Sequence, residues 1–194
     1  MKKIFLILIT LLFCSSCYNY QEVNEIAIVD GIGIDYQNNE YKITFEIVDI
    51  NSEYEHSYTI ESIANNFDSA INNTKELSSK EISLSHLETV VISKNLNIDQ
   101  IIDIGKYFIN SNDVTTNFYL VTSDNASNIL NNKNDINSIN TKNISDMLDV
   151  EKDIKYQFDY IISSILNDKD TTIPYISLED NNIKIDKEGY KYEK

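Results

Sequence analysis

The placement of the cysteines is the feature that most constrains how this chain can fold. Both of them, Cys14 and Cys17, lie within the first 17 of its 194 residues. No disulfide framework and no cysteine-based metal site can therefore form in the rest of the chain. With 42% hydrophobic residues, a chain of this length has enough apolar side chains for one domain of ordinary size. We expect residues 18–194 to be held together by a hydrophobic core alone.

Residues 1–17 have the pattern of a bacterial lipoprotein signal peptide. Two lysines precede the apolar run Ile4–Phe13, which is too short for a membrane-spanning helix of ~20 residues. Two serines then supply the small side chains that a signal peptidase needs before a cysteine. We predict cleavage ahead of Cys17 and lipidation of its sulfur by a diacylglycerol. Cys14 stands where a branched aliphatic residue is usual, and the alternative is an uncleaved N-terminal anchor.

The net charge of the chain restricts its partners. There are 31 acidic and 16 basic residues, which gives a formal charge of −15, and every basic residue is a lysine. Such a chain is repelled by nucleic acid and by anionic lipid headgroups. We therefore expect no nucleic-acid partner, and we expect membrane attachment to come from acyl chains instead of a basic patch.

The first part of the predicted domain shows the two-residue period of β-strands. In Tyr41–Ile47, apolar side chains alternate with polar ones such as Glu46, which is typical of a half-buried strand. The β-prone run Glu25–Asp35 precedes it. Asn38 and Asn39 lie between the two runs, and asparagine tolerates left-handed backbone. We predict an N-terminal β-hairpin.

Helical and strand-like segments alternate along the rest of the chain. The predicted helices are Glu61–Ser78, a helix capped by Asn97 and reaching Ile109, a short helix at Asp124–Leu130 capped by Ser123 or Asp124, and Ile144–Leu166. The predicted strands are Ser57–Ile60, Leu87–Ser93, Phe118–Val121, Ile173–Ile176 and Ile183–Ile185. The Asn-rich segment 131–143 is predicted to be a loop. This order indicates an α/β domain of the α+β type, with a mixed β-sheet and helices packed against it.

The segment Asp30–Asp35 contains two glycines and invites comparison with phosphate-binding loops. A third glycine is absent, and the residues that follow open another strand, so no helix N-terminus would face a phosphate. We interpret the segment as a bulge or a tight strand end.

Other candidates for chemistry are few. We expect His56 to face solvent at a strand edge, and His86 to be a hydrogen-bonded structural histidine before a buried strand. No G-x-S-x-G elbow is present. Asp168 and Asp170 flank a lysine without the ordered pattern of a calcium loop. We predict no catalytic residue, no metal site and no cofactor, and we assign no binding residue.

Several segments, taken in order, resemble the N-terminal region of the Ger(x)C family, the lipoprotein C subunits of nutrient germinant receptors in spore-forming bacteria. The segments are Cys17-Tyr18-Asn19, Glu22–Asp35 with its Gly-x-Gly-x-Asp, Ser85–Lys94, Asn117–Thr122 with Ala126–Leu130, and Ile173-Pro174 with the tail around Gly189. Each segment alone is weak, and their order along nearly the whole chain carries the resemblance. The family usually has tryptophan where this chain has Tyr18, and it continues into further domains beyond the point where this chain ends.

The resemblance implies a non-enzymatic subunit of a nutrient germinant receptor, with residues 18–194 as the N-terminal domain of a shortened form. It implies anchoring by a lipid on Cys17 to the outer leaflet of the spore's inner membrane, and partnership with the integral-membrane A and B subunits. The alternative is a generic envelope lipoprotein that binds a small solute or serves as a scaffold. An enzyme is the third possibility and would need polar groups converging on His56 or His86.

Overall fold

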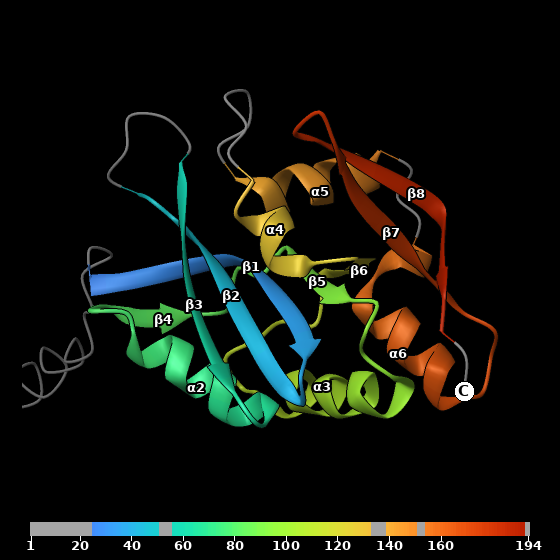
Figure 1. Ribbon diagram of the computed structural model, residues 1–194, viewed down its shortest axis with the longest axis horizontal. Helices are drawn as coiled ribbons and strands as arrows, with labels where there is room; N and C mark the ends of the chain where they lie inside the picture. Colours follow the sequence, from blue (N-terminus) through green and yellow to red (C-terminus); the bar gives the residue numbers. More distant parts are fainter. Residues whose placement is uncertain (1–24, 51–55, 133–138, 151–153, 193–194) are drawn as a thin grey trace, which may run out of the picture.

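The computed structural model describes residues 25–50, 56–132, 139–150 and 154–192, and its centre is a mixed β-sheet (Figure 1). The strand order is β3-β2-β1-β5-β6-β7-β8, and β4 pairs with the first residues of β1. The strands are β1 (Ile26–Gln37), β2 (Glu40–Val48), β3 (Ser57–Ala64), β4 (Glu81–Ser83), β5 (Thr89–Ser93), β6 (Tyr119–Ser123), β7 (Thr172–Glu179) and β8 (Asn182–Lys191). In this order, the adjacent pairs β1-β5, β5-β6 and β6-β7 are parallel. The pairs β3-β2, β2-β1 and β7-β8 are antiparallel.

Helices cover both faces of this sheet, so the domain has three layers (Figure 1). The helices are α2 (Phe67–Glu76), α3 (Ile98–Asn110), α4 (Ala126–Leu130), α5 (Asn140–Asp149) and α6 (Phe158–Leu166). α4 and α5 lie on one face, and α2, α3 and α6 lie on the other. The predicted α+β arrangement is confirmed. Within the described ranges, no helix is both long and apolar enough to cross a membrane.

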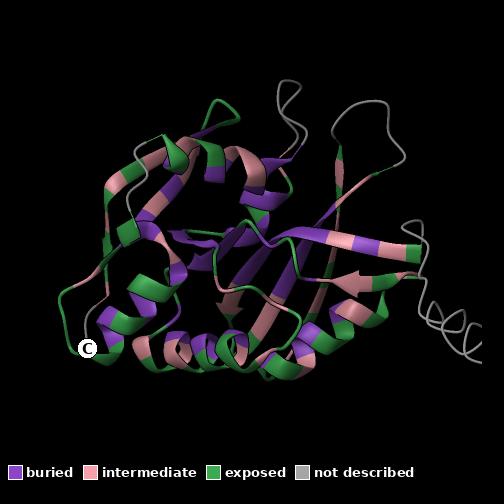
Figure 2. Cartoon of the chain, turned by 180° about the vertical axis from the view of Figure 1, so that it is seen from behind, coloured by how far each residue is buried: buried purple, intermediate pink, exposed green. Residues whose placement is uncertain are grey.

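Two hydrophobic cores follow from the three layers. The larger lies between the sheet and α2, α3 and α6, and includes Phe45, Phe108 and Phe158. The smaller lies under α4 and α5, and includes Val121 and Leu148. Every residue of β5 and β6 is buried, and burial is concentrated on the central strands and on the inner sides of the helices (Figure 2). The central strands therefore contribute side chains to both cores, as strands covered on both faces must.

The predicted N-terminal hairpin is confirmed. β1 and β2 pair antiparallel as far as Gln37 and Glu40, and the two residues between them, Asn38 and Asn39, have φ angles of 54° and 62°. A two-residue hairpin turn with two left-handed residues matches the twist of the strands, and asparagine adopts that backbone more readily than most residues.

The predicted helix Glu61–Ser78 is wrong in its first part. Residues up to Ala64 continue strand β3, and α2 begins only at Phe67, after Asn66, which caps it through a hydrogen bond from the Ser69 N–H. Ile63 suggested a helical stripe because it lies four residues before Phe67. In the structure Ile63 is 57% exposed, and its partner across the strands is Lys42.

The predicted single helix Ile144–Leu166 is two helices, and packing explains the break. α5 buries Ile144 and Leu148 in the smaller core, whereas α6 buries Phe158 and Ile161 in the larger one. One straight helix cannot lie on both faces of a sheet. Between α5 and α6, Gln157 forms an isolated β-bridge with Tyr119 at the start of β6.

The capping predictions had different outcomes. Asn97 caps α3, and the side chain of Gln100 accepts a hydrogen bond from the Asn97 N–H in return, which completes a capping box. The cap of α4 is Asn125, not Ser123 or Asp124, because Ser123 still belongs to β6.

Candidate functional site

The two glycines of β1 are the points where helices approach the sheet most closely. A Cβ atom added at Gly31 would lie 2.0 Å from Cγ2 of Thr141 in α5. A Cβ atom added at Gly33 would lie 3.3 Å from the backbone of Ala126, the first residue of α4. The close packing of α5 leaves no space for a side chain at Gly31, and the start of α4 leaves little space at Gly33. The pairing register with β2 also shifts between Val29 and Gly31 while β1 continues to Gln37, so of the two predicted alternatives, a bulge or a tight strand end, the structure has the irregularity of a bulge.

Asp35 follows these glycines and binds the start of α4. Its two carboxylate oxygens accept hydrogen bonds from the backbone N–H groups of Ala126 and Ser127, at 2.7 and 2.8 Å. Both groups lie in the first turn, where backbone donors have no partner inside the helix. A negative charge at this end also interacts favourably with the helix dipole. Asp35 thus attaches α4 to β1.

Glu46 of β2 does the same for α5, and it is fully buried. Its Oε1 accepts hydrogen bonds from the Asn140 N–H at 2.7 Å and from the Ser57 hydroxyl at 2.8 Å. Its Oε2 accepts from the N–H and the hydroxyl of Thr141, at 2.9 and 2.7 Å. Four donors match the acceptor capacity of one carboxylate. This carboxylate replaces the local cap of α5, since Ile139 at the N-cap position has no side chain that could accept a hydrogen bond.

Asp30 extends the cluster through Thr141. The Thr141 hydroxyl lies 2.7 Å from Glu46 Oε2 and 3.2 Å from Asp30 Oδ2. A hydroxyl carries one hydrogen, so it donates to Glu46 across the shorter contact, and its oxygen accepts from Asp30 when Asp30 is protonated. Burial, together with the neighbouring carboxylates of Glu88 and Glu46, raises the pKa of Asp30 from 3.8 to about 7. A proton on Asp30 therefore completes the hydrogen-bond chain.

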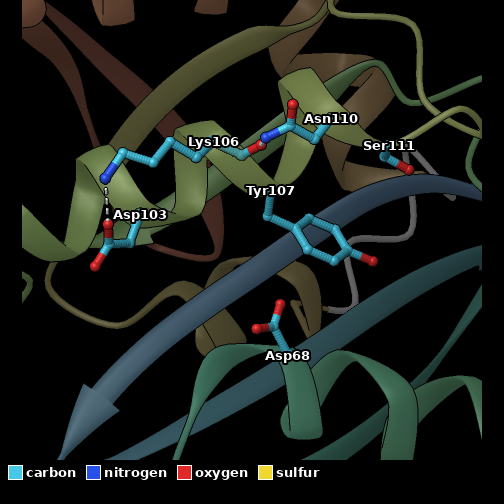
Figure 3. Close-up of a pocket in the computed structure, with 6 residues that line it drawn as sticks. All are labelled: Asp68, Asp103, Lys106, Tyr107, Asn110 and Ser111. Carbon is cyan, nitrogen blue, oxygen red and sulfur yellow. Dashed lines mark hydrogen bonds and ion pairs between the residues drawn. The ribbon is translucent and has the colours of Figure 1, made fainter.

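A second candidate is an open groove of about 480 Å³ between α2 and α3. Asp68 of α2 and the ring of Tyr107 of α3 face each other across it, and Lys106 forms an ion pair of 2.8 Å with Asp103 (Figure 3). Burial and the nearby Asp68 raise the pKa of the Tyr107 hydroxyl, while its ring packs edge-on against Phe67 at 5.2 Å. The groove presents a phenol and a carboxylate to solvent, and Tyr107 also belongs to the packing between the two helices.

Comparison with models of known protein families shows which family this domain belongs to. The model of the "Spore germination protein N-terminal domain" matches residues 19–178. The chain belongs to this family. No curated protein and no solved structure matches the chain. The match covers the sheet from β1 almost to the end of β7, and it gives the protein a role in spore germination. The family resemblance seen in the sequence is thereby confirmed.

In this germination domain the Asp-Gly-x-Gly-x-Asp segment has a structural explanation. Its two glycines admit two helices, and the acids at its two ends, Asp30 and Asp35, contact the first turns of α5 and α4. The sequence predicted a structural role for this segment but did not predict its contacts with α4 and α5.

The two histidines of the germination domain lie apart from this cluster. His56 is exposed at the start of β3, as predicted. His86 is also exposed, so the prediction of a buried, hydrogen-bonded histidine is wrong. The turn between β4 and β5 is anchored instead by its two leucines, Leu84 and Leu87, which are 0% and 3% exposed. The apolar neighbours of His86 in the sequence face the core, while His86 itself points to solvent.

We expect His86→Ala to change the free energy of unfolding by less than ~0.5 kcal/mol, because substitutions of exposed side chains usually have small effects. Leu87→Ala, one position later, should cost about 2–5 kcal/mol, since it removes a buried side chain. Urea denaturation of both variants measures the difference. A loss for His86→Ala close to that for Leu87→Ala would contradict the exposed placement.

The remaining predicted site residues have ordinary surroundings or lie outside the description. Cys17, the predicted lipidation site, lies outside the described residues, and its lipidation stays a prediction. Asp170 forms an ion pair of 3.2 Å with Lys191 of β8, and Asp168 has a left-handed φ of 55° in the turn after α6. In the described part of the chain, no three histidine, cysteine or acidic residues gather closely enough to hold a metal ion.

Two residues of the cluster, Asn140 and Thr141, were assigned to the predicted loop 131–143. They are in fact the first residues of α5, and both are buried. Asn140 also ties α5 to α4, because its side-chain amide donates to the carbonyl of Leu130 at 3.0 Å. No local capping pattern marks this helix start. Its cap is Glu46, about ninety residues earlier in the chain, and a regular alternation of polar residues in β2 had suggested that Glu46 faces solvent.

Proposed function

We propose that this chain is a lipid-anchored, non-enzymatic subunit of a nutrient germinant receptor, acting with integral-membrane subunits in the spore's inner membrane. The observation that carries the proposal is the family match, which begins at residue 19, two positions after Cys17. The lipoprotein-like sequence of residues 1–17 and the germination domain are thus directly adjacent. A role in the spore envelope requires export, and the residues before the domain have the pattern that export requires.

The distance between the anchor and the domain supports a position at the membrane surface. β1 begins at Ile26, nine residues after Cys17. A fully extended chain of nine residues spans at most about 32 Å, which is comparable to the diameter of a small domain. The formal charge of −15 opposes direct adsorption to anionic lipids. The proposed acyl chains would therefore hold the domain close to the bilayer, where integral-membrane partners are within reach.

The hydrogen bonding of two acids, the buried Glu46 and the half-buried Asp35, supports a non-enzymatic role. Glu46 and Asp35 use their carboxylate oxygens to bind the first turns of α5 and α4. Acid groups committed in this way stabilise a framework and do not face a substrate. We propose that the domain works by binding its partner subunits.

The two cysteines of the chain provide a matched test of the anchor. Cys17→Ala should abolish incorporation of labelled palmitate and leave the uncleaved precursor, because the sulfur that carries the lipid is gone. Cys14→Ala should be processed and labelled as the wild type is. Both variants are expressed in a sporulating host, and membrane fractions are compared by mobility and label. Normal labelling of Cys17→Ala would refute the anchor.

The receptor role needs a separate measurement. The full chain, carrying an affinity tag at its C-terminus, should co-purify from detergent-solubilised spore membranes with two multi-pass membrane proteins encoded by neighbouring genes. A lipoprotein that labels normally but purifies alone would support the alternative of a generic envelope lipoprotein.

A further inference from the structure

The two outer edges of the β-sheet differ in how they are protected. An outer edge strand presents unpaired backbone N–H and C=O groups, and proteins usually guard it with charges, proline or bulges. β8 has such guards: its ten residues include Lys184, Asp186 and Glu188, and the pairing with β7 shifts register opposite Gly189. β3 at the other edge has the sequence Ser-Tyr-Thr-Ile-Glu-Ser-Ile-Ala, which contains one charge and neither proline nor glycine.

β3 is also exposed on both of its faces. Its residues are intermediate or exposed throughout. Tyr58 is 45% exposed on the face that carries α2, and Ile63 is 57% exposed on the opposite face. The register with β2 is regular over all eight residue pairs, from Val48–Ser57 to Tyr41–Ala64. Among the described residues, no strand pairs with the outer side of β3. A regular edge of eight residues with one charged side chain and no proline or bulge is a template for another strand.

We propose that the outer edge of β3 is a docking site for an extended segment of a partner protein, which adds a strand to the sheet. The row of backbone donors and acceptors selects an extended backbone, and this is the geometry of strand addition. Side chains next to Tyr58 and Ile63 would be apolar. The occupant is a basic or neutral chain, because the protein carries a formal charge of −15; Glu61, midway along the edge, is itself paired with Lys42 at 2.9 Å. A second copy of this chain would bring together two proteins that each carry a formal charge of −15, which like charges disfavour.

The test uses the full chain and a defined peptide. The probe is a fluorescent nine-residue peptide of alternating valine and threonine with a lysine at each end. Its control is the same peptide with an N-methyl group on every internal residue, which keeps the side chains and the charge but removes the donors along both edges, so that neither edge can pair with β3. Binding is measured by fluorescence anisotropy at physiological salt. We expect the unmethylated peptide to bind and the methylated one to bind at least about tenfold more weakly.

Protein variants locate the site. Ile63→Lys places a guarding charge on the edge and should weaken binding about tenfold. Leu166→Lys is the matched control, because Leu166 is similarly exposed at 55% but ends α6. Neither change removes a buried contact, so both variants should fold. Absence of binding, equal binding of the methylated peptide, or equal loss in both variants would overturn the proposal. Dimers of the chain that Ile63→Lys dissociates in analytical ultracentrifugation would also overturn it, in favour of self-pairing.

Discussion

Glu46→Ala is expected to destabilise the domain by about 3–5 kcal/mol, because buried backbone donors of α5 lose the carboxylate that satisfies them. The substitution leaves the backbone N–H groups of Asn140 and Thr141 without their acceptor, and it removes one hydrogen bond from each of the hydroxyls of Ser57 and Thr141. Buried donors without partners each carry a desolvation penalty. Urea denaturation monitored by circular dichroism gives the difference in free energy of unfolding.

The control for this substitution lies two residues away on the same strand. Thr44 is as fully buried as Glu46, and its hydroxyl has no hydrogen-bond partner among the described residues. Thr44→Val keeps the shape and removes an unsatisfied hydroxyl, so stability should be unchanged or slightly higher. Equal losses for the two variants would mean that any change in the middle of β2 is damaging, and the assigned role of Glu46 would be wrong.

Asp30→Asn should stabilise the domain by about 2–4 kcal/mol at pH 8 and have little effect near pH 4. In the folded state the pKa of Asp30 is raised from 3.8 to about 7 by burial and by neighbouring carboxylates. Below pH 4 the folded and unfolded chains both hold the proton. As the pH rises from 4 to 7, the unfolded chain releases the proton while the folded chain retains it, so stability falls. Above pH 7 the loss is complete. Asparagine never ionises, and its amide can still donate to Thr141.

The measurement is the free energy of unfolding of wild type and Asp30→Asn across pH 4–8, taken as a difference so that other titrating groups cancel. Asp113→Asn, which changes an exposed acid between α3 and β6, should leave the wild-type pH profile in place. A difference between wild type and Asp30→Asn that does not vary with pH would show that Asp30 is ionised throughout this range.

Local signals in the sequence were sufficient for the elements that are specified locally. The Asn38-Asn39 turn between two strand-like segments predicted the hairpin, and Asn97 ahead of a helical apolar stripe predicted the cap of α3. Both features join residues that are close in the chain. The α+β class followed from the same short-range patterns, because the order of strands and helices needs no knowledge of contacts between distant segments.

The cluster around Glu46 could not be predicted in this way. Its polarity suggested an exposed residue, whereas its partners are the first residues of α5 in a segment whose many asparagines suggested a loop. When a distant carboxylate replaces the local cap, residue propensities and the spacing of apolar residues do not reveal where a helix begins. The same holds for the break between α5 and α6, which depends on the sheet that the two helices cover on opposite faces.

Strand β1 borders both hydrophobic cores, and it therefore determines how the domain can unfold. Ile32 and Ile34 belong to the larger core, while Gly31 and Gly33 touch α5 and α4 across the other face. Because the same strand closes both cores, neither helical layer can leave the sheet by itself without weakening the other. The domain should therefore open as one cooperative unit centred on β1, so a force applied through a chain attached ahead of Ile26 would act directly on the element whose release unfolds the whole domain.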